Sequence, residues 1–189
     1  MSAARDRMRD AWRADRAANL RYPKSRFVLR WLRVCQRWRE TPGRVGRAAY
    51  VLTAGGYKIA TEWVLGIELP PSTRVGPGLR LRHGVGVVVN PGTTIGRGVM
   101  LRHGVTLGNR RTADDCPTIE DDVEIGVGAV VIGAVTVGRG ARIGPYAVVV
   151  KDVPPGAVVR SPRAEVVMPT SRPGAPGDTR AREAIGGAA

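Results

Sequence analysis

The stretch IEDDVEIGVGAVVIGAVTVGRGARIGPYAVVV, residues 119–150, places an aliphatic residue at every sixth position. These residues are Ile119, Ile125, Val131, Val137, Ile143 and Val149. A helix repeats its faces every 3.6 residues and a strand every two, so neither explains a sustained period of six. Short hexapeptide repeats are typical of parallel β-helices. Each repeat then forms one flat strand, and three repeats complete one coil of roughly 18 residues.

The same phase continues towards the N-terminus at Val89, Ile95, Leu101 and Leu107. We expect residues 67–160 to form this solenoid, with the aliphatic residues stacked inside it about 4.8 Å apart. The sequence therefore predicts a mainly β protein with two appendages. Residues 1–66 are expected to be helical and basic, and the Pro-, Gly- and Ala-rich residues 161–189 are expected to form a flexible tail.

Charge is concentrated in residues 1–66, which hold 15 Lys and Arg against 5 Asp and Glu, a net +10 of the total +14. Tryptophans alternate with arginines there, which fits either a solvated arginine face over a buried aromatic stripe or a surface that rests on anionic lipid. A nucleic-acid partner is disfavoured because these helices carry no recognisable nucleic-acid motif.

Two cysteines, Cys35 and Cys116, are too few for a disulfide scaffold and indicate a reducing compartment. We see no signal peptide and no apolar stretch long enough to span a bilayer. We therefore expect a cytoplasmic protein, with peripheral contact at the inner face of the membrane through residues 1–66 as a further expectation.

Both histidines of the chain lie in copies of the pentapeptide LRHGV, at 81–85 and 101–105. Their separation of 20 residues is one coil plus two, so a two-residue bulge just after His83 would keep both on one edge of the prism. A neutral imidazole can accept a proton from a hydroxyl group when a carboxylate orients its other nitrogen. Glu68, 15 residues before His83, is the candidate. The alternative is a surface histidine without a catalytic role.

A polar loop at residues 107–119 interrupts the repeat, and such loops commonly carry substrate contacts. Open backbone for an extended ligand and cations for its phosphates are expected from Gly108, Asn109, Arg110, Arg111 and Arg142. Cys116 is a conceivable nucleophile, but no histidine is near it in sequence and Pro117 follows it. We interpret Cys116 as a structural or pocket-lining residue.

The segments LRLRHGVGVVVNPG (79–92), GVTLGN (104–109) and CPTIEDDVEIGVGAVVIGAVTVGRGARIGPYAVVVKDVPPGAVV (116–159) resemble the hexapeptide-repeat acyltransferases. The similarity is greatest to serine O-acetyltransferases and to colanic acid biosynthesis acetyltransferases. It implies a left-handed parallel β-helix, a homotrimer or a dimer of trimers, and acetyl-CoA as co-substrate in the groove between adjacent prisms. No metal is implied.

The resemblance also implies roles for individual residues. His83 matches the catalytic base, and Glu68 stands where the serine enzymes place an aspartate that orients it. His103 becomes a neighbour that shapes the acceptor pocket. Positions that line the coenzyme groove are matched by Gly108, Asn109, Val127, Gly128 and Arg142, with Arg110 beside them.

Departures from the serine enzymes concern the acceptor. Arg82 replaces the acidic residue that precedes their catalytic histidine, and Asp115 and Cys116 replace an Arg-His pair before the proline. We therefore expect an O-acetyltransferase that acts on a sugar or another polyhydroxylated acceptor by direct attack, with serine or homoserine as the alternative acceptor.

Two alternatives from other classes remain. One is a non-catalytic solenoid scaffold with a membrane-binding basic helix. The other is a relative of the γ-carbonic anhydrases, which need three metal-binding histidines per site, whereas this chain has two.

Overall fold

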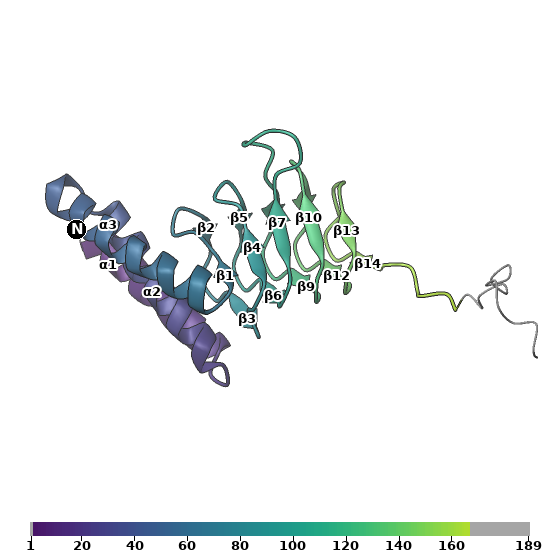
Figure 1. The fold of residues 1–189 in the computed structure, drawn as a ribbon, viewed down its shortest axis with the longest axis horizontal. Helices are drawn as coiled ribbons and strands as arrows, with labels where there is room; N and C mark the ends of the chain where they lie inside the picture. The colour runs from purple at the N-terminus through teal and green to yellow at the C-terminus, as the bar shows by residue number, and fades with distance from the viewer. Residues whose placement is uncertain (1, 167–189) are drawn as a thin grey trace, which may run out of the picture.

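The computed structural model describes residues 2–166, in which three helices precede a parallel β-helix (Figure 1). The helices are α1 (Ser2–Ala18), α2 (Pro23–Glu40) and α3 (Gly43–Lys58), and α3 continues into a π-helical turn, η1 (Ile59–Val64). The part of the predicted tail from residue 167 onwards lies outside the described residues. The fold class expected from the six-residue period is confirmed.

Three parallel sheets form the faces of the prism, and successive strands of the chain pass from one sheet to the next. Sheet A contains β1 (Ile67–Glu68), β4 (Val87–Val89), β7 (Thr106–Gly108), β10 (Val130–Ile132) and β13 (Val148–Val149). Sheet B contains β2 (Arg74–Val75), β5 (Thr94–Ile95), β8 (Thr118–Ile119) and β11 (Thr136–Val137). Sheet C contains β3 (Arg80–Arg82), β6 (Met100–Arg102), β9 (Glu124–Ile125), β12 (Arg142–Ile143) and β14 (Val158–Val159).

The predicted inward positions form the core of the prism. All of them are at most 5% exposed: Val89, Ile95, Leu101, Leu107, Ile119, Ile125, Val131, Val137, Ile143 and Val149. Each stacks on an aliphatic side chain of the next coil, as Ile125 does between Leu101 and Ile143. Apolar burial of this kind is the main force that stabilises the solenoid.

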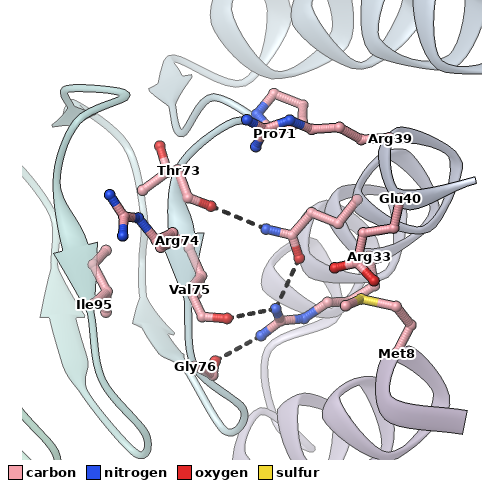
Figure 2. A pocket seen from close by; sticks show the side chains of 11 residues that line it. Met8, Arg33, Arg39, Glu40, Pro71, Thr73, Arg74, Val75, Gly76 and Ile95 are labelled. Atoms are coloured by element: carbon pink, nitrogen blue, oxygen red, sulfur yellow. Dashed lines mark hydrogen bonds between the residues drawn. The ribbon is translucent and has the colours of Figure 1, made fainter. Parts of the chain in front are cut away.

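The helices cover the first coil, at the end of the prism where β1, β2 and β3 have no further strand beyond them (Figure 1). Buried polar side chains of α1 and α2 bind the backbone of that coil. Arg33 donates to the carbonyl oxygens of Val75 and Gly76 at 2.7 Å each (Figure 2). Gln36 donates to the carbonyl oxygen of Thr73 at 3.1 Å. Side chains therefore take the place that a preceding strand would have.

Asp15 and Asn19 of the first helical hairpin complete this seam. The Asp15 carboxylate accepts hydrogen bonds from the amides of Gly78 and Leu79, and the Asn19 side chain donates to the Leu79 carbonyl. The expected solvated arginine face therefore has one exception. Arg33 is 4% exposed and forms an ion pair with Asp15. It is buried because its guanidinium donates hydrogen bonds to the backbone at the edge of the solenoid.

The α3 helix passes through the Gly55–Gly56 pair without a break. A β-carbon on Gly56 would lie 3.1 Å from the ring of Trp31, and the Trp31 indole donates to the Thr53 carbonyl. The missing side chain at Gly56 thus lets α3 approach α2 closely.

Candidate functional site

Both histidines lie where sheet C turns into sheet A, an edge that we call the C–A corner. Their rings are 6.1 Å apart between centroids and nearly perpendicular, and both side chains are exposed. The prediction that His83 and His103 share one edge of the prism is confirmed.

The two LRHGV copies are nevertheless not equivalent. Arg82 pairs with Arg102 in register, but the amide of Gly104 donates to the carbonyl of Val85, and Gly86 and Gly104 occupy matching left-handed turns at φ 70° and 69°. His103 therefore aligns with Val85. The two extra residues of the coil are His83 and Gly84 themselves, so the predicted bulge contains His83 and does not follow it.

His83 adopts φ 68°, a left-handed conformation that is costly for a residue with a β-carbon. Residues held in such conformations cluster at functional sites. The bulge thus lifts one imidazole out of the repeat and leaves the other within it.

The turn between α1 and α2 brings an aromatic ring to this corner. The Tyr22 ring meets the His83 ring edge-on at 5.6 Å, and the Arg82 guanidinium lies 4.4 Å from the centroid of the Tyr22 ring. Arg82 also donates to the carbonyl of Ala18 at 3.4 Å. Contacts with the helical region therefore hold Tyr22 and Arg82 in place beside His83.

Glu68 is not brought into hydrogen-bonding contact with His83. It is exposed on β1 and pairs in register with Val88 on sheet A, whereas His83 lies on the turn before that strand. Among residues 2–166, no carboxylate oxygen lies within 4.0 Å of either imidazole. The rings of Tyr22 and His103 lie next to the His83 ring.

The polar loop, residues 109–117, leaves the prism at a different edge, between sheets A and B, which we call the A–B corner. Asp115 accepts hydrogen bonds from the amides of Arg110 and Arg111 at 2.9 and 2.7 Å. The Cys116 thiol donates to the Asn90 side chain at 3.1 Å, and Asn90 donates to Asn109 at the same distance. Asp115 thus closes the loop on itself, and Cys116 attaches the loop to the coil below.

These contacts shift the pKa values of Cys116 and Asp115. Burial raises the pKa of the Cys116 thiol, and the nearby charges of Asp115 and Asp114 raise it further. A thiol with a raised pKa is a poor nucleophile at neutral pH. Partial desolvation raises the pKa of the Asp115 carboxyl, but backbone hydrogen bonds from Arg110, Arg111 and Thr112 and the charge of Arg111 outweigh it, so that pKa is lowered overall.

A depression of about 580 Å³ lies on the outer face of sheet C beside the C–A corner. Val127 and Arg142 line it, together with two further arginines, Arg102 and Arg160. Gly128 continues the corner, and its amide donates to the carbonyl of His103. This depression offers cations for phosphate groups next to the histidines.

The predicted site residues therefore divide between two edges of one prism. His83, His103, Arg82, Val127 and Gly128 gather at the C–A corner, and Arg142 lies on sheet C beside it. At the A–B corner lie Gly108, Asn109, Arg110, Asp115 and Cys116. One copy of the chain does not bring the two groups together.

Two residues with a place in these corners were not singled out from the sequence. Tyr22 lies far from the repeat in sequence, and only the docking of the helices places it against His83. Asn90 could have been noticed, because it stands directly after the inward Val89, as Gly108–Asn109 follow Leu107.

Within residues 2–166, no three His, Cys, Asp or Glu side chains gather as a metal site requires. In the same residues, no helix is long and apolar enough to cross a bilayer.

Comparison with known proteins gives the class first. Residues 116–151 match the family of bacterial transferase hexapeptide proteins (six repeats). The Helicobacter pylori (strain J99) serine acetyltransferase is 40% identical over 108 residues, which are 56% of this chain and 63% of that protein. The chain spans about half the length of the curated relatives it matches, 42% in the case of the Bacillus licheniformis serine acetyltransferase.

Solved structures agree. The crystal structure of the Neisseria gonorrhoeae serine acetyltransferase is 30% identical, with a TM-score of 0.69 over 87% of this chain and 68% of that one. The same enzyme in complex with serine aligns with a TM-score of 0.67 at 27% identity, over 88% of this chain and 70% of that one. The chain belongs to the hexapeptide-repeat acyltransferase family, as its motifs predicted.

Proposed function

We propose that this protein is an acetyl-CoA-dependent O-acetyltransferase whose acceptor is serine. The observation that carries the proposal is the placement of His83, which a two-residue bulge lifts from the repeat at a corner lined by Arg82, Tyr22 and His103. The relatives named above, which are serine acetyltransferases, support serine more strongly than the sugar acceptor expected from the sequence.

In this reaction His83 takes the proton from the acceptor hydroxyl as the oxygen attacks the thioester carbonyl of acetyl-CoA. The imidazolium then returns the proton to the departing thiolate, so the enzyme forms no covalent intermediate. Arg82 and Arg102, paired on sheet C next to His83, supply positive charge for the carboxylate of serine. For the ammonium group of serine, Glu68 and Asp114 offer exposed carboxylates. Within residues 2–166, neither of them forms an ion pair.

The two corners would meet between copies. The outer face of sheet A carries valines at three of its five positions, Glu68, Val88, Thr106, Val130 and Val148, whereas sheet B carries Arg74, Thr94, Thr118 and Thr136 at its outer positions. Three prisms that turn sheet A towards a threefold axis place the C–A corner of one copy beside the A–B corner of the next. A homotrimer of this kind completes the site and forms the groove for acetyl-CoA.

A second acceptor class is favoured by the surroundings of two residues, Arg82 and Asp115. Arg82 occupies the place where serine enzymes carry an acid, and its guanidinium is held over Tyr22. Asp115 is also engaged by backbone amides and offers no free carboxylate for an ammonium group. A neutral, polyhydroxylated acceptor needs no such carboxylate.

The test is a thiol-release assay of the full chain with acetyl-CoA and either serine, homoserine, nucleotide sugars or simple glycosides. We expect the highest kcat/KM with serine, and His83→Ala should lower kcat by at least a hundredfold. The highest kcat/KM on a glycoside would replace serine by the second acceptor class. Full turnover by His83→Ala, with an unchanged unfolding midpoint, would refute the mechanism.

A further inference from the structure

The α3 helix and the π-helical turn that follows it carry large apolar side chains that no other part of residues 6–166 covers. Six of them are more than 60% exposed: Val45, Val51, Leu52, Ile59, Trp63 and Val64. We call this set the α3 face. Val45, Leu52 and Ile59 are spaced seven residues apart, which is close to two helical turns, so they form one stripe. An uncovered apolar stripe of this kind marks an interaction surface.

Cations accompany the α3 face. Arg44, Arg47 and Lys58 are exposed on the same helix. Within residues 2–166, neither Arg44 nor Arg47 has a carboxylate within 4.0 Å, and Lys58 meets only Glu62, at 3.7 Å.

The positive charge favours an anionic lipid surface over a second copy of this chain as the partner of the α3 face. A second copy of this chain would bring another region of net charge +10 against the first, and like charges at an interface oppose association. An anionic bilayer surface attracts basic side chains instead and accepts Trp at its polar–apolar boundary. Apolar insertion and charge attraction together are the two signals that stable peripheral binding needs.

We propose that the α3 face rests on an anionic lipid surface, with Trp63, Leu52 and Ile59 inserted among the headgroups and Arg44 and Arg47 against the phosphates. Binding is peripheral, since none of the described helices can span the bilayer. The proposal does not depend on the acceptor. It places the enzyme at the membrane through the helices that also seal the end of its solenoid.

The test is co-sedimentation of the full chain with vesicles of phosphatidylcholine alone or with about one-third phosphatidylglycerol. We expect binding to the anionic vesicles only, and its loss at about 0.5 M salt. Leu52→Ser/Trp63→Ser and Arg44→Gln/Arg47→Gln should each weaken binding by about tenfold or more. Matched controls lie on the solenoid, where Val158→Ser removes an exposed apolar side chain and Arg97→Gln/Arg139→Gln removes two charges. Both should bind as the unaltered chain does.

Three results would overturn the proposal. The unaltered chain could fail to bind anionic vesicles, or the α3-face variants could bind as tightly as the controls while melting at the same temperature. The third is a change of oligomeric state in Leu52→Ser/Trp63→Ser at unaltered lipid affinity, measured by sedimentation velocity, which would assign the α3 face to contact between copies.

Discussion

The Arg33 guanidinium and the Asp15 carboxylate meet at 2.8 Å inside the seam between the helices and the first coil, where the two side chains are 4% and 1% exposed. Each also binds the backbone of the solenoid, Arg33 through carbonyl oxygens of the β2 region and Asp15 through amides that precede β3. The ion pair therefore joins the helices to the solenoid through these backbone hydrogen bonds as well as through the attraction between the two charges.

Arg33→Met should destabilise the protein by about 3–5 kcal/mol, because it leaves the Asp15 charge buried without its cation. Arg37→Met removes an exposed arginine from the same helix and should change the free energy of unfolding by only about 0.5 kcal/mol. Urea denaturation of both variants measures the difference. Equal free energies of unfolding would show that the seam does not depend on this pair.

Tyr22→Leu should lower kcat by up to about tenfold, because the edge-on contact of its ring orients the His83 imidazole. Tyr22→Phe keeps the ring and should retain the activity. A Leu variant as active as the Phe variant, in the thiol-release assay, would remove Tyr22 from the site.

The division of the site between two corners predicts complementation. His83→Ala and Asn109→Ala/Arg110→Ala should each be inactive alone. In mixed trimers they should together recover about one-third of the unaltered activity, since one of the three junctions in each mixed trimer joins an intact His83 to an intact loop. Tandem-affinity purification of mixed trimers and the same assay test this. No recovery in verified mixed trimers would place the whole site within one copy.

Alkaline pH should destabilise the fold through Tyr57. Burial raises the pKa of its phenol, and the charges of Cys35 and Glu62 raise it further. The unfolded chain releases this proton near pH 10 while the folded chain keeps it, so the stabilisation is complete below about pH 10 and declines above it. Tyr57→Phe should reduce the decline by up to about 1.4 kcal/mol per pH unit in urea denaturation at pH 8 and near pH 11. An unchanged slope would contradict this.

The Cys116 thiol should react slowly with iodoacetamide at neutral pH, because its raised pKa leaves little thiolate. Its labelling rate, followed by peptide mass spectrometry, should begin to rise at a higher pH than that of a free cysteine peptide. Cys116→Ser should keep the acetyltransferase activity. Rapid labelling at pH 7 would reopen a nucleophilic role.

The solenoid was predictable because one aliphatic residue in six is a local, repeated signal, and it located every strand from β4 to β13 within its sheet. The two-residue slip near His83 was also visible as a change of phase. The alignment of His103 with Val85 was not, because identical pentapeptides conceal a difference that only the stacking of Gly104 on Gly86 reveals.

The seam was beyond sequence reasoning for a different reason. Arg33 is one of many arginines in α2, and nothing local separates it from Arg30 or Arg37. Its role depends on backbone groups more than 40 residues away, at Val75 and Gly76. Likewise, Glu68 has the right spacing from His83, yet its strand directs it to the outer face of sheet A.

A parallel β-helix has strand edges at both ends, and each edge can accept the strands of another prism. The side chains of Asp15, Asn19, Arg33 and Gln36 already occupy backbone donors and acceptors of the first coil from Thr73 to Leu79. Stacking of prisms end to end into fibres is therefore blocked at that end. The helices thus close one end of the solenoid and also place Tyr22 beside His83.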